Sequence, residues 1–215
     1  IKHHLYGYVD TNRSYSGAAW LKDCLLVLNS ILKKNKIPIV VGGTGLYLEF
    51  LYKGINQIPA VSVEIRKKVN NEINYKGLDY AYEKLKKIDL NYSEIISKRD
   101  KQRIARSLEV YYQTGNNISY YHKNKRIKTD YKFEKLLLMP NKEIIKNNCE
   151  MRFIKMLDLG LVEEVSKNHG KVKNCNVANA IGFRQINSYL KKEISLAEAT
   201  EISVKKTKEY SKRQC

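Results

Sequence analysis

The amino-acid sequence predicts an α/β protein with a helical unit inserted between its strands. The run IPIVV, residues 37–41, is rich in β-branched residues and precedes glycines, as expected of a strand buried on both faces. The run KLLLMP, residues 135–140, shows the same strand pattern. Residues 61–112, between the two runs, show helical periodicity without a strand candidate. A helix that leads into a buried strand is typical of α/β folds.

Capping residues and helical spacing predict the remaining elements. Ser16 is placed to cap a helix that ends near residue 35, and Asp100 and Gly115 mark the two ends of another. Residues 116–132 are polar and basic without a period, which predicts a flexible surface loop. Further helices are expected at 46–52, 62–73, 78–88, 142–158, 161–169, 178–190 and 196–212, the last opened by the capping-box pair Ser195 and Glu198. The expected domains are an α/β core over 1–56, a helical insertion over 57–128 and the continued core with C-terminal helices over 129–215.

The composition indicates a folded protein with a polyanionic partner. Forty Lys and Arg against 22 Asp and Glu give a formal net charge of +18, part of which reflects a composition rich in Lys, Asn, Ile and Tyr. The four cysteines lack the spacing of metal ligands, so we expect reduced thiols in a cytoplasmic protein and no metal-binding side chains. No apolar run approaches the roughly 20 residues that a membrane span needs.

The glycine turn after the first strand candidate is a candidate ligand site. Backbone N–H groups of Gly42 to Gly45 would lie at a helix N-terminus, and the Thr44 hydroxyl would point into the crevice where α/β ligands bind. Leu48 stands where a dinucleotide fingerprint needs glycine, and no Gly-Lys-Ser/Thr sequence follows, so neither phosphate motif is complete. A tight turn that lets strand and helix pack closely is an equal alternative.

Arginines are the other candidate ligand groups. Arg99, Arg103 and Arg106 are spaced to share one helix face, which suits phosphates, although a solvated polar face is the common alternative. Arg152 by itself is interpreted as an ordinary surface arginine. The segment NAIGFR, residues 179–184, places a glycine in a helix-like stretch, which predicts close approach of another backbone.

Six motifs taken in order resemble the tRNA dimethylallyltransferase family from His3 to Gln214: HHLYGYVDTNRSYS, PIVVGGTGLY, RDKQRIARSLEVYYQTG, MRFIKMLDLGLVEEV, NAIGFRQINSYL and TKEYSKRQ. The resemblance implies a P-loop-NTPase-like parallel-sheet core, with nucleotide (ATP) binding as a family feature, and an inserted helical domain that grips the tRNA anticodon stem-loop. It implies a monomer that uses Mg²⁺ and transfers a dimethylallyl group from dimethylallyl diphosphate to tRNA. The acceptor would be the N6 amine of the adenosine next to the anticodon on its 3′ side, flipped out of its stack.

The resemblance also assigns roles to residues. Thr44 matches a catalytic threonine beside the acceptor amine, and Arg152 matches an arginine that binds the donor's diphosphate. The positions that match tRNA contacts are Arg66, Gln102, Arg103, Ile104, Ala105, Arg106, Asn179, Ala180, Ile181, Gly182, Phe183, Arg184, Lys212, Arg213 and Gln214.

The sequence departs from the family pattern in ways that leave two alternatives open. The family's P-loop and its Asp-Ser motif, which supplies the general base, are expected upstream of Ile1, so residues 1–215 alone are expected to be inactive. Asn148 stands where relatives often carry a basic residue, and Phe183 stands for the usual tyrosine. An adenylate isopentenyltransferase that acts on a free nucleotide is one alternative. A non-catalytic basic RNA-binding module is the other.

Overall fold

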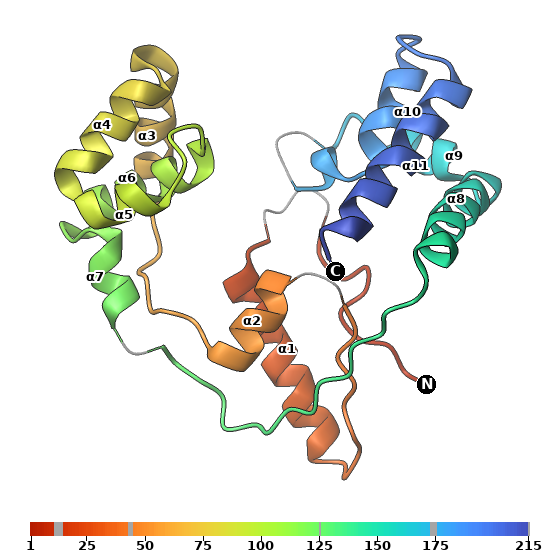
Figure 1. The fold of residues 1–215 in the computed structure, drawn as a ribbon, viewed down its shortest axis with the longest axis horizontal. Helices are drawn as coiled ribbons and strands as arrows, with labels where there is room; N and C mark the ends of the chain where they lie inside the picture. The colour runs from red at the N-terminus through yellow and green to blue at the C-terminus, as the bar shows by residue number, and fades with distance from the viewer. Residues whose placement is uncertain (11–14, 43–44, 125, 173–175, 215) are drawn as a thin grey trace. The chain divides into compact units, whose positions relative to one another are not determined.

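The computed structural model describes residues 1–10, 15–42, 45–124, 126–172 and 176–214 (Figure 1). The chain divides into two compact units. One unit, called the helical unit below, is Tyr52–Asp130, and the other combines Ile1–Leu51 with Tyr131–Cys215.

Five helices build the helical unit around one apolar core. They are α3 (Val63–Lys76), α4 (Leu78–Ile88), α5 (Leu90–Ile95), α6 (Lys101–Thr114) and α7 (Ile118–Lys123). Helix α6 lies centrally and buries Ile104, Leu108 and Val110 completely. The Asp100 carboxylate caps α6 by accepting from the Arg103 N–H at 3.0 Å, and Gly115 ends it in the left-handed conformation. The sequence therefore predicted both ends of α6 from its capping residues.

The chain enters and leaves the helical unit through one antiparallel bridge. Ile55 and Ile127 exchange two backbone hydrogen bonds, of 3.2 and 3.0 Å. Gly54 makes this approach possible, because a Cβ on it would lie 2.0 Å from the Ile127 carbonyl oxygen. Its φ of +75° also favours glycine. The two ends of the helical unit are consequently tied to each other.

The other unit contains an N-terminal helix pair and a C-terminal group of helices. Helix α1 (Gly17–Leu32) begins at the Ser16 cap, and its Trp20 ring stacks on Tyr47 of α2 (Gly45–Lys53) at 4.7 Å. The C-terminal helices are α8 (Lys142–Asp158), α9 (Leu161–Asn168), the 3₁₀ helix η1 (Asn176–Asn179), α10 (Phe183–Leu190) and α11 (Leu196–Lys212). Their shared core includes Phe153, Val165 and Ile186.

The prediction of an α/β fold with a P-loop-NTPase-like parallel sheet is wrong for this chain. The described residues form helices and the single bridge, with no sheet among them. The structure assigns no strand to either expected run, and Ile39 is 82% and Leu137 76% exposed. A strand is stable only when a neighbour accepts and donates its backbone hydrogen bonds. The prediction of two buried strands is therefore wrong, because a local apolar run does not show whether the described residues supply a partner strand.

Smaller corrections concern the helices. Helix α7 lies inside residues 116–132, which were expected to form a loop, and α5 was not expected. The helix expected over 178–190 is interrupted between η1 and α10, where Gly182 has a φ of +96°. None of the helices described here is long and apolar enough to cross a membrane.

Candidate functional site

A surface cavity of about 510 Å³ lies among the C-terminal helices. Its lining is Arg152, Phe153, Met156, Asn179, Ala180, Ile181, Thr207, Tyr210 and Arg213. Three of the sequence-predicted groups therefore meet here: the diphosphate-binding Arg152, part of the segment 179–184, and Arg213 near the chain end. These groups come from α8, from η1 and the turn after it, and from the end of α11.

Helices α8 and α11 form two walls of the cavity and are joined at its edge. Phe153 is buried in the core shared by the C-terminal helices, which fixes the rotation of α8 and leaves the adjacent Arg152 exposed. The Lys208 ammonium of α11 donates to the Glu150 carboxylate of α8 at 3.0 Å. The same contact neutralises Glu150, which is the acidic residue nearest Arg152 in sequence.

The segment 179–184 forms the third wall and is shaped by Gly182. A Cβ on Gly182 would lie 3.2 Å from the Phe153 ring, and the Gly182 N–H donates to the Gln185 side-chain oxygen at 2.9 Å. The sequence predicted close approach of another backbone at this glycine, and that prediction is wrong because the nearby group is the Phe153 side chain. Asn179, Ala180 and Arg184 are exposed, whereas Gly182 is buried.

The end of α11 places a cation beside an aromatic ring at the cavity. The Arg213 guanidinium carbon lies 6.0 Å from the centroid of the Tyr210 ring, and both side chains line the cavity. Lys212 and Gln214 are exposed on either side of Arg213. The sequence did not single out Tyr210, although its spacing of three from Arg213 places the two on one helix face.

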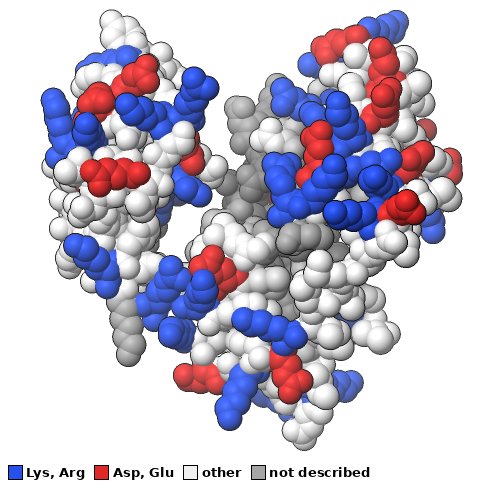
Figure 2. All heavy atoms as spheres, viewed as in Figure 1, with Lys and Arg blue, Asp and Glu red and all other residues white. Residues whose placement is uncertain are grey.

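The electrostatics of the cavity favour an anion. Among the described residues, neither Arg152 nor Arg213 has a carboxylate within ion-pair distance. Figure 2 shows Lys and Arg gathered on the visible side near the end of α11. Two arginines above an apolar floor that includes Phe153 and Ile181 suit a ligand with phosphate groups and an apolar or aromatic part.

The remaining predicted RNA contacts lie on α3 and α6 of the helical unit. Arg66, Gln102 and Arg103 are exposed, and Arg106 is half-buried. The Ile104 and Ala105 side chains are buried in the core, so these side chains are not available to a ligand. Arg99 precedes α6 and therefore does not share its face.

The arginines of α6 already have acidic partners. Arg103 pairs with the Asp100 carboxylate at 3.3 Å, and Arg106 pairs with Glu109 at 3.7 Å. Such exposed pairs are weak, but an RNA phosphate must still displace the carboxylate to gain a bidentate contact. The α6 arginines are thus less available to an anion than those of the cavity.

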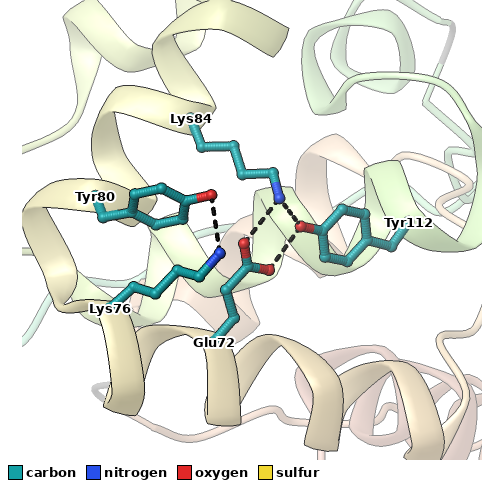
Figure 3. Close-up of polar contacts among 5 residues, drawn as sticks. All are labelled: Glu72, Lys76, Tyr80, Lys84 and Tyr112. Carbon is teal, nitrogen blue, oxygen red and sulfur yellow. Dashed lines mark hydrogen bonds and ion pairs between the residues drawn. The ribbon is translucent and has the colours of Figure 1, made fainter.

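A polar cluster of Glu72, Lys84 and Tyr112 joins three helices beneath this face (Figure 3). The Lys84 ammonium donates to Glu72 at 2.8 Å, the Tyr112 hydroxyl donates to Glu72 at 2.7 Å, and Lys84 also contacts the Tyr112 hydroxyl. Burial alone would raise the pKa of the Glu72 carboxyl, but the hydrogen bonds from Lys84 and Tyr112 outweigh it, and the net pKa is lowered. Burial raises the pKa of Tyr112, and the pKa of Lys84 is raised because its hydrogen bonds to Glu72 and Tyr112 outweigh burial.

The Lys84 side chain of this cluster is 31% exposed and that of Glu72 is 13% exposed. Lys68 and Lys84 also lie over the Tyr112 ring, at 4.9 and 4.8 Å from its centroid. This cluster gives its cations partners within the helical unit and locks α3, α4 and α6 together. The sequence did not predict it.

Two predicted features have no counterpart in the described part of the chain. Thr44 lies outside the described residues, so its predicted catalytic role stays a prediction. No group of three or more His, Cys, Asp or Glu side chains able to hold a metal ion occurs among the residues described.

Comparison with known proteins identifies the family. All 215 residues match the family described as IPP transferase. The tRNA dimethylallyltransferase of Pelagibacter ubique is 37% identical over all of this chain and 69% of its own length, and that of Nitrosomonas eutropha is 34% identical over the same shares. The enzyme of that name from Orientia tsutsugamushi is 34% identical over 95% of this chain and 61% of its own length. The chain therefore spans about two thirds of the length of these curated relatives.

Solved structures agree with this assignment. A eukaryotic dimethylallyltransferase acting on tRNA shares a TM-score of 0.77 and 26% identity over 96% of this chain and 53% of that protein. The tRNA isopentenylpyrophosphate transferase of Bacillus halodurans shares a TM-score of 0.58 and 25% identity over 100% of this chain and 67% of that protein. These matches show that the chain belongs to the IPP transferase family.

Proposed function

We propose that this protein transfers a dimethylallyl group from dimethylallyl diphosphate to the N6 amine of the adenosine on the 3′ side of the tRNA anticodon. Membership of the IPP transferase family supports the reaction type. The observation that carries the proposal is the cavity in which Arg152 and Arg213 lie without acidic partners among the described residues. A diphosphate and a polynucleotide are both polyanions, and two unpaired guanidinium groups suit them.

The bond changes define what the side chains must do. The bond between the dimethylallyl C1 and a diphosphate oxygen breaks, and a bond between C1 and the adenosine N6 forms. The diphosphate leaves with the electron pair, and N6 loses one proton. Arg152 binds the diphosphate and stabilises the negative charge that develops on it during the break. Its exposed position on α8 leaves the guanidinium free to make bidentate hydrogen bonds.

We assign alignment of the acceptor amine to Thr44. A threonine hydroxyl can accept a hydrogen bond from the N6 amine and hold its lone pair toward C1. The family resemblance supports this role. The general base that takes the proton is assigned to no residue of this chain.

We assign binding of the anticodon stem to the exposed and half-buried polar residues of α3 and α6. Arg66, Gln102, Arg103 and Arg106 suit phosphate and ribose oxygens, which a protein reads by shape rather than by base sequence. Binding through such contacts weakens as the salt concentration rises, because each contact releases counterions.

A transfer assay with the natural full-length protein tests the proposal. The protein is incubated with radiolabelled dimethylallyl diphosphate and either tRNA or AMP, and label in each acceptor is counted. We expect label in tRNA at the adenosine next to the anticodon and little in AMP. Preference for AMP would support an adenylate isopentenyltransferase instead. Binding of tRNA without transfer would support a non-catalytic RNA-binding module.

A further inference from the structure

We propose that Tyr210 is a stacking platform for one unpaired nucleotide of the bound tRNA, and that Arg213 holds the phosphate of that nucleotide. The inference rests on the proposed function, which supplies the RNA. It adds a base-binding role for an aromatic side chain to the arginine contacts already described. The chemical class of the ligand at this point is a single nucleotide within a longer strand.

The geometry of α11 carries the proposal. Tyr210 lies in the last turn of α11, lines the cavity and is 42% exposed, so its ring is accessible. The Arg213 guanidinium carbon lies over the Tyr210 ring, 6.0 Å from its centroid, which places a cation at one face of a flat aromatic surface and leaves the opposite face for a nucleobase. A nucleotide consists of a flat base joined through its sugar to a phosphate. The base can stack on the Tyr210 ring while the phosphate pairs with the Arg213 guanidinium.

The other residues of the cavity favour the same ligand. The Thr207 hydroxyl donates to the Ser203 carbonyl at 2.8 Å, so it is committed to its own helix. Lys208 is committed to Glu150. Arg213 lines the cavity and, among the described residues, has no carboxylate partner, so it is left for an external phosphate, and Met156 and Ile181 add apolar surface to the same lining.

The position of Tyr210 relative to Arg152 gives the pair a role in the reaction. Both side chains line one cavity, so a nucleotide on Tyr210 would lie next to the diphosphate on Arg152. Stacking there would compensate for part of the unstacking energy that drawing a base out of the anticodon loop costs. Tyr210 is thus a positioning residue for the RNA, and it takes no part in proton transfer.

Fluorescent stem-loops test the proposal. Anticodon stem-loop RNAs carry 2-aminopurine at one unpaired position at a time, and fluorescence and Kd are measured with the natural full-length protein and its variants. We expect the unaltered protein to quench 2-aminopurine at one position through stacking. Tyr210→Leu should abolish that quenching and weaken binding about tenfold, since base stacking on an aromatic contributes about 1 to 3 kcal/mol. Tyr210→Phe should retain both properties.

The contribution of the Arg213 charge to RNA binding is measured separately, from the salt dependence of Kd. Arg213→Gln should reduce the dependence of log Kd on log salt by about 0.7 to 0.9 units, whereas Tyr210→Leu should leave it unchanged. Tyr120→Leu, which removes another exposed tyrosine, is the matched control and should leave the quenching intact.

If the unaltered protein binds the RNA and Tyr210→Leu changes neither quenching nor Kd, the inference is wrong and the proposed function stands. If the unaltered protein binds no tRNA, the proposed function itself fails.

Discussion

The helical unit and the C-terminal helices are both rich in cations but use them differently. In the helical unit, Arg103 and Arg106 are paired with carboxylates, and Lys84 is bonded to Glu72 and Tyr112. In the cavity, Arg152 and Arg213 have no such partner among the described residues. The formal charge of +18 therefore overstates what is available to a ligand. An arginine without a carboxylate partner is the better guide to an anion site, because an anion that binds there does not have to displace a carboxylate.

The largest expected effect is on the core that holds the helical unit together. Leu108→Ala should lower the free energy of unfolding by about 3 kcal/mol, because it removes a completely buried side chain and leaves a cavity. Urea denaturation followed by circular dichroism measures the change. Leu90→Ala, at a half-exposed position of the same unit, is the control and should cost far less. Equal losses for the two variants would show that the α6 core does not dominate the stability of this unit.

The next largest effect is expected on kcat/KM when Arg152, an arginine of the cavity, is replaced. Arg152→Gln should lower kcat/KM for dimethylallyl diphosphate about 100-fold, as expected when a group that stabilises developing charge is removed. The melting temperature should not change, because the side chain is exposed. Lys155→Gln removes a charge from the same helix outside the cavity lining and should retain kcat/KM. An unchanged kcat/KM in Arg152→Gln would remove Arg152 from the donor site.

A smaller effect on stability is expected from Glu72, whose ion pair with Lys84 should make its contribution depend on pH. Glu72→Gln should destabilise the helical unit by about 1 kcal/mol at neutral pH, because Lys84 and Tyr112 lose an ionised acceptor. The folded-state pKa of Glu72 is lowered, so its contribution is present above the ordinary glutamate pKa of about 4.3 and is lost as the pH falls through the lower folded value. Urea titrations of both proteins at several pH values measure the difference.

The difference between wild type and Glu72→Gln should therefore be constant from about pH 6 to 8 and shrink below about pH 4. Glu83→Gln, at an exposed position of α4, is the matched control and should show little effect at any pH. A difference that grows on acidification would contradict the assigned direction of the pKa shift.

The smallest effect is expected on tRNA binding when Arg103 is replaced, because this arginine already has an acidic partner. Arg103→Gln should weaken tRNA binding by no more than about threefold, because the Asp100 carboxylate competes with RNA phosphate for this guanidinium. Asp100→Asn preserves the helix cap and releases Arg103, so it should tighten binding slightly. Filter binding at two salt concentrations measures both. A loss of tenfold or more in Arg103→Gln would show that internal pairing does not limit RNA contact.

Local signals predicted much of the helical structure. Asp100 and Gly115 marked the ends of α6, and Ser195 with Glu198 marked the start of α11, where both capping-box hydrogen bonds form. Such signals work because the interacting groups are neighbours in sequence. The short α5 and α7 were missed because their lengths of six residues give too few positions for a periodic pattern.

Features that depend on distant residues were predicted poorly. The two apolar runs predicted buried strands, but strand pairing depends on a partner that no local pattern reveals. The Glu72 cluster needs three helices to meet, and the Tyr210 surface is recognisable only once α8 and α11 enclose a cavity. For the site, resemblance to relatives predicted Arg152, the segment 179–184 and Arg213, while their presence around one cavity came from the fold.

The bridge between Ile55 and Ile127 fixes the separation of the two chain segments that enter and leave the helical unit. Two backbone hydrogen bonds hold the incoming and outgoing chain together near the ends of the unit, so these two points are natural junctions for an exchange between relatives. Gly54 sets the condition for such grafts, because any side chain there would collide with the Ile127 carbonyl and pry the clasp open. A chimaera that keeps this glycine thus keeps the bridge when the helices between its two residues are exchanged for those of a relative.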